Sequence, residues 1–84
     1  MFKARVYVTL KKDVLDPQGK AVKNSLISLG YDEVSDLRVG KYIEVTLNIE
    51  NKEVATERVE EMCKNLLANT VIEDYQFEID EVQS

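Results

Sequence analysis

The strongest constraint on the fold is a strict alternation of apolar and polar residues at the start of the chain. From Phe2 to Leu10 every second side chain is apolar. A period of two places the apolar set on one face, so this stretch predicts a half-buried β-strand. The alternation returns near the end of the chain, where it predicts a strand over about 71–82 with Tyr75, Phe77 and Ile79 facing inward.

The stretch Leu15–Val22 joins the first strand to a predicted helix. Asp16 is a preferred N-cap residue, and Pro17 follows at the first helical position, where a missing N–H costs nothing. Gly19 in the first turn costs up to ~1 kcal/mol relative to alanine. Its missing side chain therefore indicates a close approach by another backbone, a partner subunit or an anionic ligand, or else avoidance of a clash with the preceding strand.

Two further strands are predicted in the middle of the chain, over Val34–Val39 and Ile43–Ile49, separated by Gly40-Lys41. A tight two-residue turn would place the apolar residues of the two strands on opposite faces. A three-residue loop or a bulge at Gly40 would place them on one face. The pattern therefore predicts an irregular hairpin.

Each of two predicted helices has an apolar stripe to bury. The first runs to about Leu29, and its stripe is Val22, Leu26 and Leu29. The second begins at the N-cap Asn51 and runs to about Ala68, with a stripe of Ala55, Val59, Met62 and Leu66. The predicted fold is α+β: one βαββαβ domain over residues 1–84, with a single antiparallel sheet and both helices on one face, a ferredoxin-like plan.

Composition excludes several classes of function. The single cysteine, Cys63, forms no internal disulfide, and without histidine the chain has neither a Cys/His metal pattern nor a Cys-His nucleophile pair. A net charge of −5 disfavours nucleic-acid binding. No stretch approaches the ~20 apolar residues of a membrane span, so we expect a cytoplasmic protein. A chain of 84 residues is marginally stable alone, which favours oligomerisation. We predict no catalytic residue and no metal site.

Two segments carry a resemblance to a known family. Asp16-Pro17-Gln18-Gly19 with Ala21-Val22, and Leu37-Arg38-Val39-Gly40-Lys41-Tyr42 about twenty residues later, resemble the PurS family of small subunits of phosphoribosylformylglycinamidine (FGAM) synthase. The resemblance implies a non-catalytic subunit of purine biosynthesis that bridges a glutaminase (PurQ) and a large ATP-dependent synthetase (PurL) and helps ammonia pass between them. It also implies a homodimer or tetramer. We expect this chain to bind no cofactor, while the synthetase uses ATP and Mg²⁺.

The residues of the two segments are the candidate interface: Asp16, Pro17, Gln18, Gly19, Arg38, Gly40 and Lys41. The last three are expected to project from the irregular hairpin. Alternatively, Arg38 and Lys41 are solvated charges and Gly40 provides a positive φ. The helix-free face of the sheet suits either a partner or solvent; it carries Tyr7, Thr9, Tyr42, Glu44, Thr46 and Gln76. The competing function is a ligand-binding regulatory module of the ACT type, which has the same element order.

Overall fold

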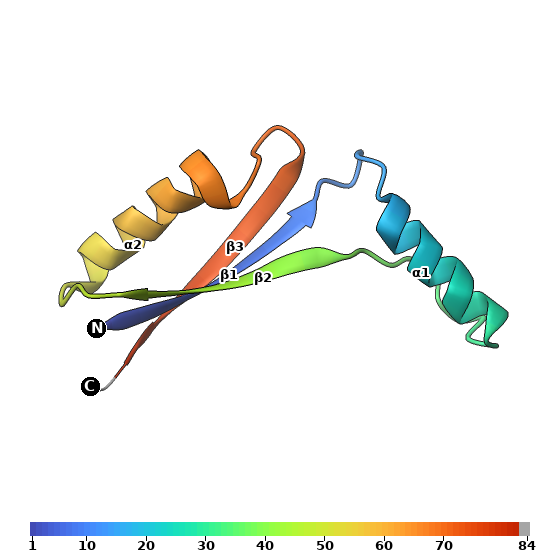
Figure 1. Ribbon diagram of the computed structural model, residues 1–84, viewed down its shortest axis with the longest axis horizontal. Coiled ribbons are helices and arrows are strands. Elements are labelled where there is room, and N and C mark those ends of the chain that lie inside the picture. The colour runs from blue at the N-terminus through green and yellow to red at the C-terminus, as the bar shows by residue number, and fades with distance from the viewer. Residues whose placement is uncertain (83–84) are drawn as a thin grey trace.

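The computed structural model describes residues 1–82; the last two residues of the predicted domain lie outside this range. Over that range an antiparallel sheet is built from β1 (Phe2–Leu10), β2 (Gly40–Leu47) and β3 (Glu73–Glu81), in the order β2-β1-β3. The helices are α1 (Pro17–Ser28) and α2 (Lys52–Met62), the latter continued by a π-helical turn, η1 (Cys63–Leu67). Figure 1 shows α2 above the sheet and α1 beyond its end. The predicted α+β class and single antiparallel sheet are confirmed.

The central strand β1 supplies the core. Its Ala4, Val6 and Val8 are fully buried, as the alternation predicts. On the opposite face Arg5 forms ion pairs with Glu78 and, at 2.9 Å, with Asp80 of β3. These cross-strand pairs support the antiparallel register between β1 and β3.

The second helix follows its predicted stripe until the π-helical turn. Ala55 and Val59 are buried, but Leu66 is 82% exposed and Leu67 packs against the core in its place. The Ala68 N–H bonds to the Cys63 carbonyl at 3.0 Å, which closes a turn one residue wider than an α-helical turn. The wider turn rotates the following side chains, so the prediction of an inward Leu66 is wrong.

Truncation of Val59 tests this core. Val59 is completely buried, so Val59→Ala leaves a cavity that the surrounding strands fill only in part. We expect the free energy of unfolding to fall by about 2 kcal/mol. Urea denaturation measures this change, and Val54→Ala, at a position 43% exposed on the same helix, is the control. An equal loss in both variants would contradict the assignment of the buried face.

Among the described residues, the predicted strand over 34–39 is absent. This segment instead forms a connection without regular secondary structure. The irregular hairpin is also wrong, because Gly40 already belongs to β2 and pairs with Thr9 of β1. The physical reason lies in the Val39 N–H, which donates to the Asp16 carboxylate at 3.0 Å instead of entering a hairpin ladder. The βαββαβ plan therefore keeps its chain order, with its second strand realised as this connection.

The first helix departs from the predicted placement, since it does not lie beside α2 on the sheet. Residues 11–39, here called the arm, leave and re-enter the sheet at the same end and carry α1 away from it (Figure 1). The radius of gyration is 16.4 Å, against about 12 Å for a compact chain of this length. Val22 is 39% and Leu29 74% exposed. The sheet of the same chain therefore does not cover the apolar stripe of α1.

Candidate functional site

The base of the arm is held by one carboxylate. Asp16 Oδ1 accepts the Gly19 N–H at 2.9 Å, and Oδ2 accepts the Val39 N–H at 3.0 Å. Asp16 therefore caps α1, as the sequence predicts, and also binds the chain on its return to the sheet. The hydrogen bond from Gly19, then that from Val39, hold the pKa of Asp16 below its usual 3.8.

Gly19 lacks a side chain because its own chain fills the space. A Cβ atom there would lie 2.5 Å from Asp16 Oδ2 and 2.9 Å from the Leu37 carbonyl oxygen. The first of these oxygens is already bound to Val39, and the second belongs to the backbone. Of the explanations considered for Gly19, close approach by another backbone is the one that the structure shows, and that backbone is the returning arm.

Arg38 closes the base of the arm from the other side. Its guanidinium donates to the carbonyl oxygens of Leu10 at 2.7 Å, Lys11 at 2.9 Å and Lys12 at 2.8 Å. A planar fork of N–H groups suits several carbonyls at once, whereas a lysine ammonium does not. The expectation that Arg38 projects from a hairpin is wrong, and so is the alternative of a solvated charge. We call Asp16, Gly19, Arg38 and Val39 the clasp.

Gly40 and Lys41 lie outside the clasp, at the start of β2. A Cβ atom at Gly40 would overlap the Val8 carbonyl oxygen and approach Thr9 Cγ2 to 2.8 Å. Among the described residues the positive φ belongs to Gly30 (104°), so that explanation for Gly40 is wrong. Lys41 Nζ lies 3.4 Å from the carboxylate of Glu73 on β3.

The seven candidate residues thus divide into three groups, of which Gly40 and Lys41 at the start of β2 are one. Asp16, Gly19 and Arg38 meet in the clasp, while Pro17 and Gln18 are exposed on the first turn of α1. Asp16 and Arg38 also line an open hollow of mixed charge, together with Lys12, Lys20, Lys23 and Asp36. The sequence does not reveal the roles of Leu37 and Val39, because they act through backbone atoms.

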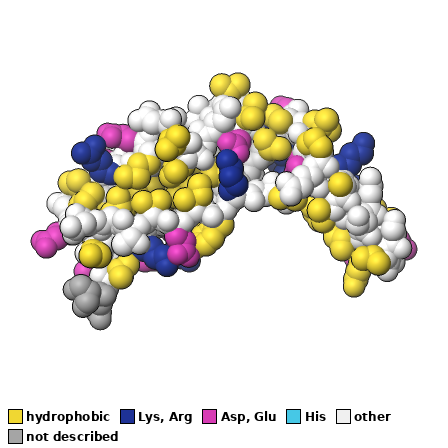
Figure 2. Space-filling view, in the orientation of Figure 1, with side chains coloured by type: hydrophobic (Ala, Val, Ile, Leu, Met, Phe, Trp, Pro, Cys, Tyr) yellow, Lys and Arg dark blue, Asp and Glu magenta, His cyan; other side chains and the backbone are white. Residues whose placement is uncertain are grey.

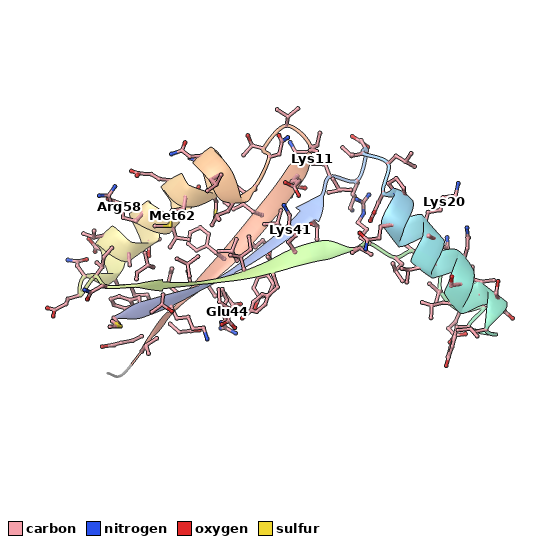
Figure 3. The ribbon with its side chains drawn as sticks, in the orientation of Figure 1. Lys11, Lys20, Lys41, Glu44, Arg58 and Met62 are labelled. Carbon is pink, nitrogen blue, oxygen red and sulfur yellow. The ribbon has the colours of Figure 1, made fainter. Side chains whose placement is uncertain are left out.

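The opposite face of the sheet carries two aromatic rings side by side. The ring centroids of Tyr7 and Tyr42 are 5.3 Å apart, and both side chains are more than a third exposed. The Tyr42 hydroxyl donates to Glu44 at 2.9 Å, and Figure 3 shows Glu44 on the side of the sheet away from α2. This is the predicted helix-free face, and its aromatic and polar character is typical of interfaces.

The clasp carboxylate and the Cys63 thiol each have a defined environment. Each oxygen of the clasp carboxylate accepts one backbone N–H, and burial raises the pKa of the Cys63 thiol, which keeps it protonated. Within residues 1–82 no cluster of three or more acidic or cysteine side chains is arranged to hold a metal ion. No helix in this range has the length and apolar character needed to cross a membrane.

The clasp carboxylate predicts a specific pH dependence. A lowered pKa in the folded state means that Asp16 stabilises the fold at pH values above about 4, and that this contribution is lost as the pH falls through the folded-state pKa. We expect Asp16→Asn to have a lower thermal midpoint than the unmodified chain at pH 7 and a smaller difference at pH 3. Thermal melts across this range measure the effect, and a constant difference would contradict it. The control is Asp13→Asn, which changes an exposed aspartate outside the clasp and should leave the thermal midpoint unchanged at both pH values.

Comparison with known proteins identifies a family whose sequences match nearly the whole chain. Residues 3–81 match the family model of PurS, phosphoribosylformylglycinamidine (FGAM) synthase. The FGAM synthase subunit PurS of Bacillus subtilis is 54% identical over 82 residues, which cover 98% of this chain and 96% of that protein.

Solved structures agree over the whole fold. PurS of Methanocaldococcus jannaschii, a subunit of formylglycinamide ribonucleotide amidotransferase in purine biosynthesis, is 42% identical with a TM-score of 0.87, covering 99% of this chain and 100% of that one. A chain of PurLQS from Thermotoga maritima is 36% identical with a TM-score of 0.85, covering 93% and 95%. These structures extend over the arm as well as the sheet.

Proposed function

We propose, from the premise that this chain belongs to the PurS family, that it is the small subunit of an FGAM synthase acting in purine biosynthesis. The observation that carries the proposal is the match along nearly the whole chain to a subunit of the Thermotoga maritima PurLQS structure. Its partners are accordingly a PurL synthetase and a PurQ glutaminase. The clasp, which fixes the direction of the arm, fits a subunit that brings other subunits together.

Membership of the PurS family implies a division of labour in the complex. A glutaminase releases ammonia from glutamine, and a synthetase uses ATP with Mg²⁺ to activate the formamide oxygen of formylglycinamide ribonucleotide, which ammonia then displaces. We propose that this chain itself binds neither a nucleotide nor a metal ion. It joins the two enzymes and assists transfer of ammonia between them, in the cytoplasm and as a homodimer or a tetramer.

The candidate interface residues take two kinds of role in this proposal. Pro17, Gln18 and Lys41 are exposed and contact a partner directly. Asp16, Gly19, Arg38 and Gly40 act indirectly, because their contacts lie within the chain and fix the direction of the arm.

Reconstitution tests the proposal. The synthetase and glutaminase are assayed with and without this chain, using glutamine in one series and free ammonia in the other. We expect the glutamine-driven reaction to require this chain and the ammonia-driven reaction to proceed without it. If neither reaction changes when the chain is added, the bridging role is wrong. Binding of an amino acid or nucleotide by the isolated chain would then favour the ACT-type function.

A further inference from the structure

We propose that the free edge of β3 binds an extended, basic segment of a partner subunit, which adds to the sheet as a further strand. β3 lies at one side of the β2-β1-β3 sheet, so within residues 1–82 only its β1 side is paired. Adding a strand to such an edge is a common way in which proteins bind peptides. The inference rests on the proposed function in that the segment belongs to one of the proposed partner subunits.

The free edge of β3 is long and regular. All nine residues from Glu73 to Glu81 pair with β1 without a bulge. The strand contains neither proline nor lysine, which are residues that commonly protect an exposed edge from pairing. A regular edge of this length is therefore a template for another strand.

The hydrogen bonds at the two ends of β3 show which backbone groups point to the free edge. The Val82 N–H donates to the Met1 carbonyl at 2.9 Å, and the Lys11 N–H donates to the Ile72 carbonyl at 2.8 Å. In an antiparallel pair, residues bonded to the neighbouring strand alternate with residues whose N–H and C=O groups point away from it. The even-numbered residues of β3 therefore bond to β1. The residues that point to the free edge include Tyr75, Phe77 and Ile79.

The charge of β3 specifies the chemistry of the added strand. Five of its nine residues are acidic and none is basic. Three of these acids are paired with Arg5 or with Lys41. Within residues 1–82 no ion pair involves Asp74 or Glu81. Lysine or arginine side chains on an added strand would lie beside these carboxylates, and cross-strand pairs of opposite charge stabilise a sheet.

The neighbouring side of α2 carries the same charge. Glu53, Glu57 and Glu60 fall at positions i, i+4 and i+7, on one side of the helix. This side faces β3, because Glu60 accepts a hydrogen bond from the Tyr75 hydroxyl at 2.8 Å. A basic strand added to β3 would therefore also lie near these glutamates.

The β2 edge of the sheet has a different character. The hollow between β2 and α2 is lined by side chains that include Val45, Ile49 and Met62, and Figure 2 shows hydrophobic side chains gathered on the body of the molecule. β2 itself carries one lysine and one glutamate, so its own charges cancel. The preference for a basic segment is therefore specific to β3.

Charge also argues against a second copy of this chain on the β3 edge. Pairing of β3 with β3 of another copy would place five carboxylates against five, and like charges opposite each other destabilise a sheet. A segment of a partner subunit with basic residues avoids this repulsion.

The two faces of the sheet specify the pattern of the added segment. Asp74 pairs with Thr9, on the helix-free face, whereas Tyr75 and Phe77 pair with Val8 and Val6 of the buried face. Successive side chains of a strand point to opposite faces. The segment that fits this edge therefore alternates basic residues with apolar residues.

A peptide probe tests the edge on the full chain without partners. The probe is a peptide of four Lys-Val repeats, and the control peptide has four Glu-Val repeats. We expect only the Lys-Val peptide to slow hydrogen exchange at the amides of Tyr75, Phe77 and Ile79, by at least about 10-fold, because these amides point to the free edge. NMR measures exchange at each amide. Unchanged exchange, or equal slowing by both peptides, would overturn the inference.

A charge reversal tests the edge in the complex. Asp74→Lys places a cation on β3, and Glu50→Lys makes the same change in the connection between β2 and α2; both positions are exposed. We expect Asp74→Lys to bind the PurL synthetase and PurQ glutaminase about 10-fold more weakly than the unmodified chain, and Glu50→Lys to bind normally. Isothermal titration calorimetry measures both affinities. Equal affinities for the two variants would contradict the proposed role of β3.

A backbone change separates strand addition from charge attraction alone. Cys63 permits chemical ligation of a synthetic segment 63–84 in which the Phe77 amide nitrogen carries a methyl group. This amide points away from β1, so methylation removes a donor of the free edge and leaves the bonds to β1 in place. We expect an unchanged thermal midpoint and binding to the complex at least about 10-fold weaker. Undiminished binding would overturn strand addition.

Two further ligated chains control the backbone change. Methylation of the Gln76 amide, which bonds to β1, should lower the thermal midpoint and so confirms which amides point to the edge. If circular dichroism shows that the chain methylated at Phe77 is unfolded, methylation at Ile79 replaces it, because the Ile79 amide also points to the free edge.

Hydrogen exchange in the reconstituted complex separates this inference from the proposed function. If the glutamine-driven reaction requires this chain and exchange over 73–81 is unchanged by the partners, strand addition is wrong and the function stands. If the Lys-Val peptide protects the edge but neither reaction responds to the chain, the function is wrong and the edge remains a binding surface for a basic strand. Protection of 73–81 that rises with the concentration of this chain alone would show a second copy on the edge and overturn the inference.

Discussion

A chain with alanine in place of Gly40 is expected to lose about 3 kcal/mol of its free energy of unfolding. The added Cβ overlaps the Val8 carbonyl oxygen and lies 2.8 Å from Thr9 Cγ2. β1 cannot move away, because its backbone is bonded to β2 on one side and to β3 on the other. Relief therefore requires β2 to separate from β1 at its first residues, where the arm ends. Urea denaturation followed by circular dichroism measures the loss.

Two further variants make this prediction specific to the observed register. Lys41→Ala, at the next position of β2, removes one ion pair of 3.4 Å and should change the free energy of unfolding by less than about 0.5 kcal/mol. Gly40→Asn should destabilise at least as much as Gly40→Ala. Asparagine tolerates the positive φ of a hairpin turn, so a well-tolerated Gly40→Asn would mean that the residue lies in the irregular hairpin and not in β2.

Local patterns of sequence predict the body of this molecule well. The alternation in residues 2–10 and 75–79 identifies β1, β3 and their inward faces, since a half-buried strand has no other way to separate its apolar residues. The caps Asp16 and Asn51 mark the starts of both helices, because each carboxylate or amide oxygen binds the N–H groups of the following turn. These features depend on neighbours within a few residues.

The placement of the arm depends on contacts that no such pattern contains. An apolar stripe such as Val22, Leu26 and Leu29 indicates that one side of a helix packs against other apolar residues. It does not indicate whether those residues belong to the same chain or to another. The clasp joins residues 10–12 to Arg38 and Asp16 to Val39 through backbone atoms, which leave no signature in residue type. Leu66 is a similar case, because the π-helical turn that exposes it cannot be read from periodicity.

Loss of Arg38 is expected to have the second large effect, and to act mainly on the arm. Arg38→Ala leaves the carbonyl oxygens of Leu10, Lys11 and Lys12 without their donor, which should lower the free energy of unfolding by about 2 kcal/mol. Hydrogen exchange measured by mass spectrometry should show faster exchange over residues 17–39 and unchanged protection in β3. Lys12→Ala removes a neighbouring cation whose side chain is exposed, and should change neither quantity.

The consequence of Arg38→Ala for assembly separates positioning from direct contact. Arg38 is half-buried, and its guanidinium is bound to three carbonyl oxygens of its own chain, so its expected effect on a partner is through the position of the arm. A loosened arm must be ordered again when it contacts a partner subunit, and this cost should weaken assembly of the complex about 10-fold. Arg38→Lys restores the charge but not the fork of donors, so it should recover only a small part of the loss. Full recovery by lysine would show that charge alone is needed, as at a direct contact with an acidic partner.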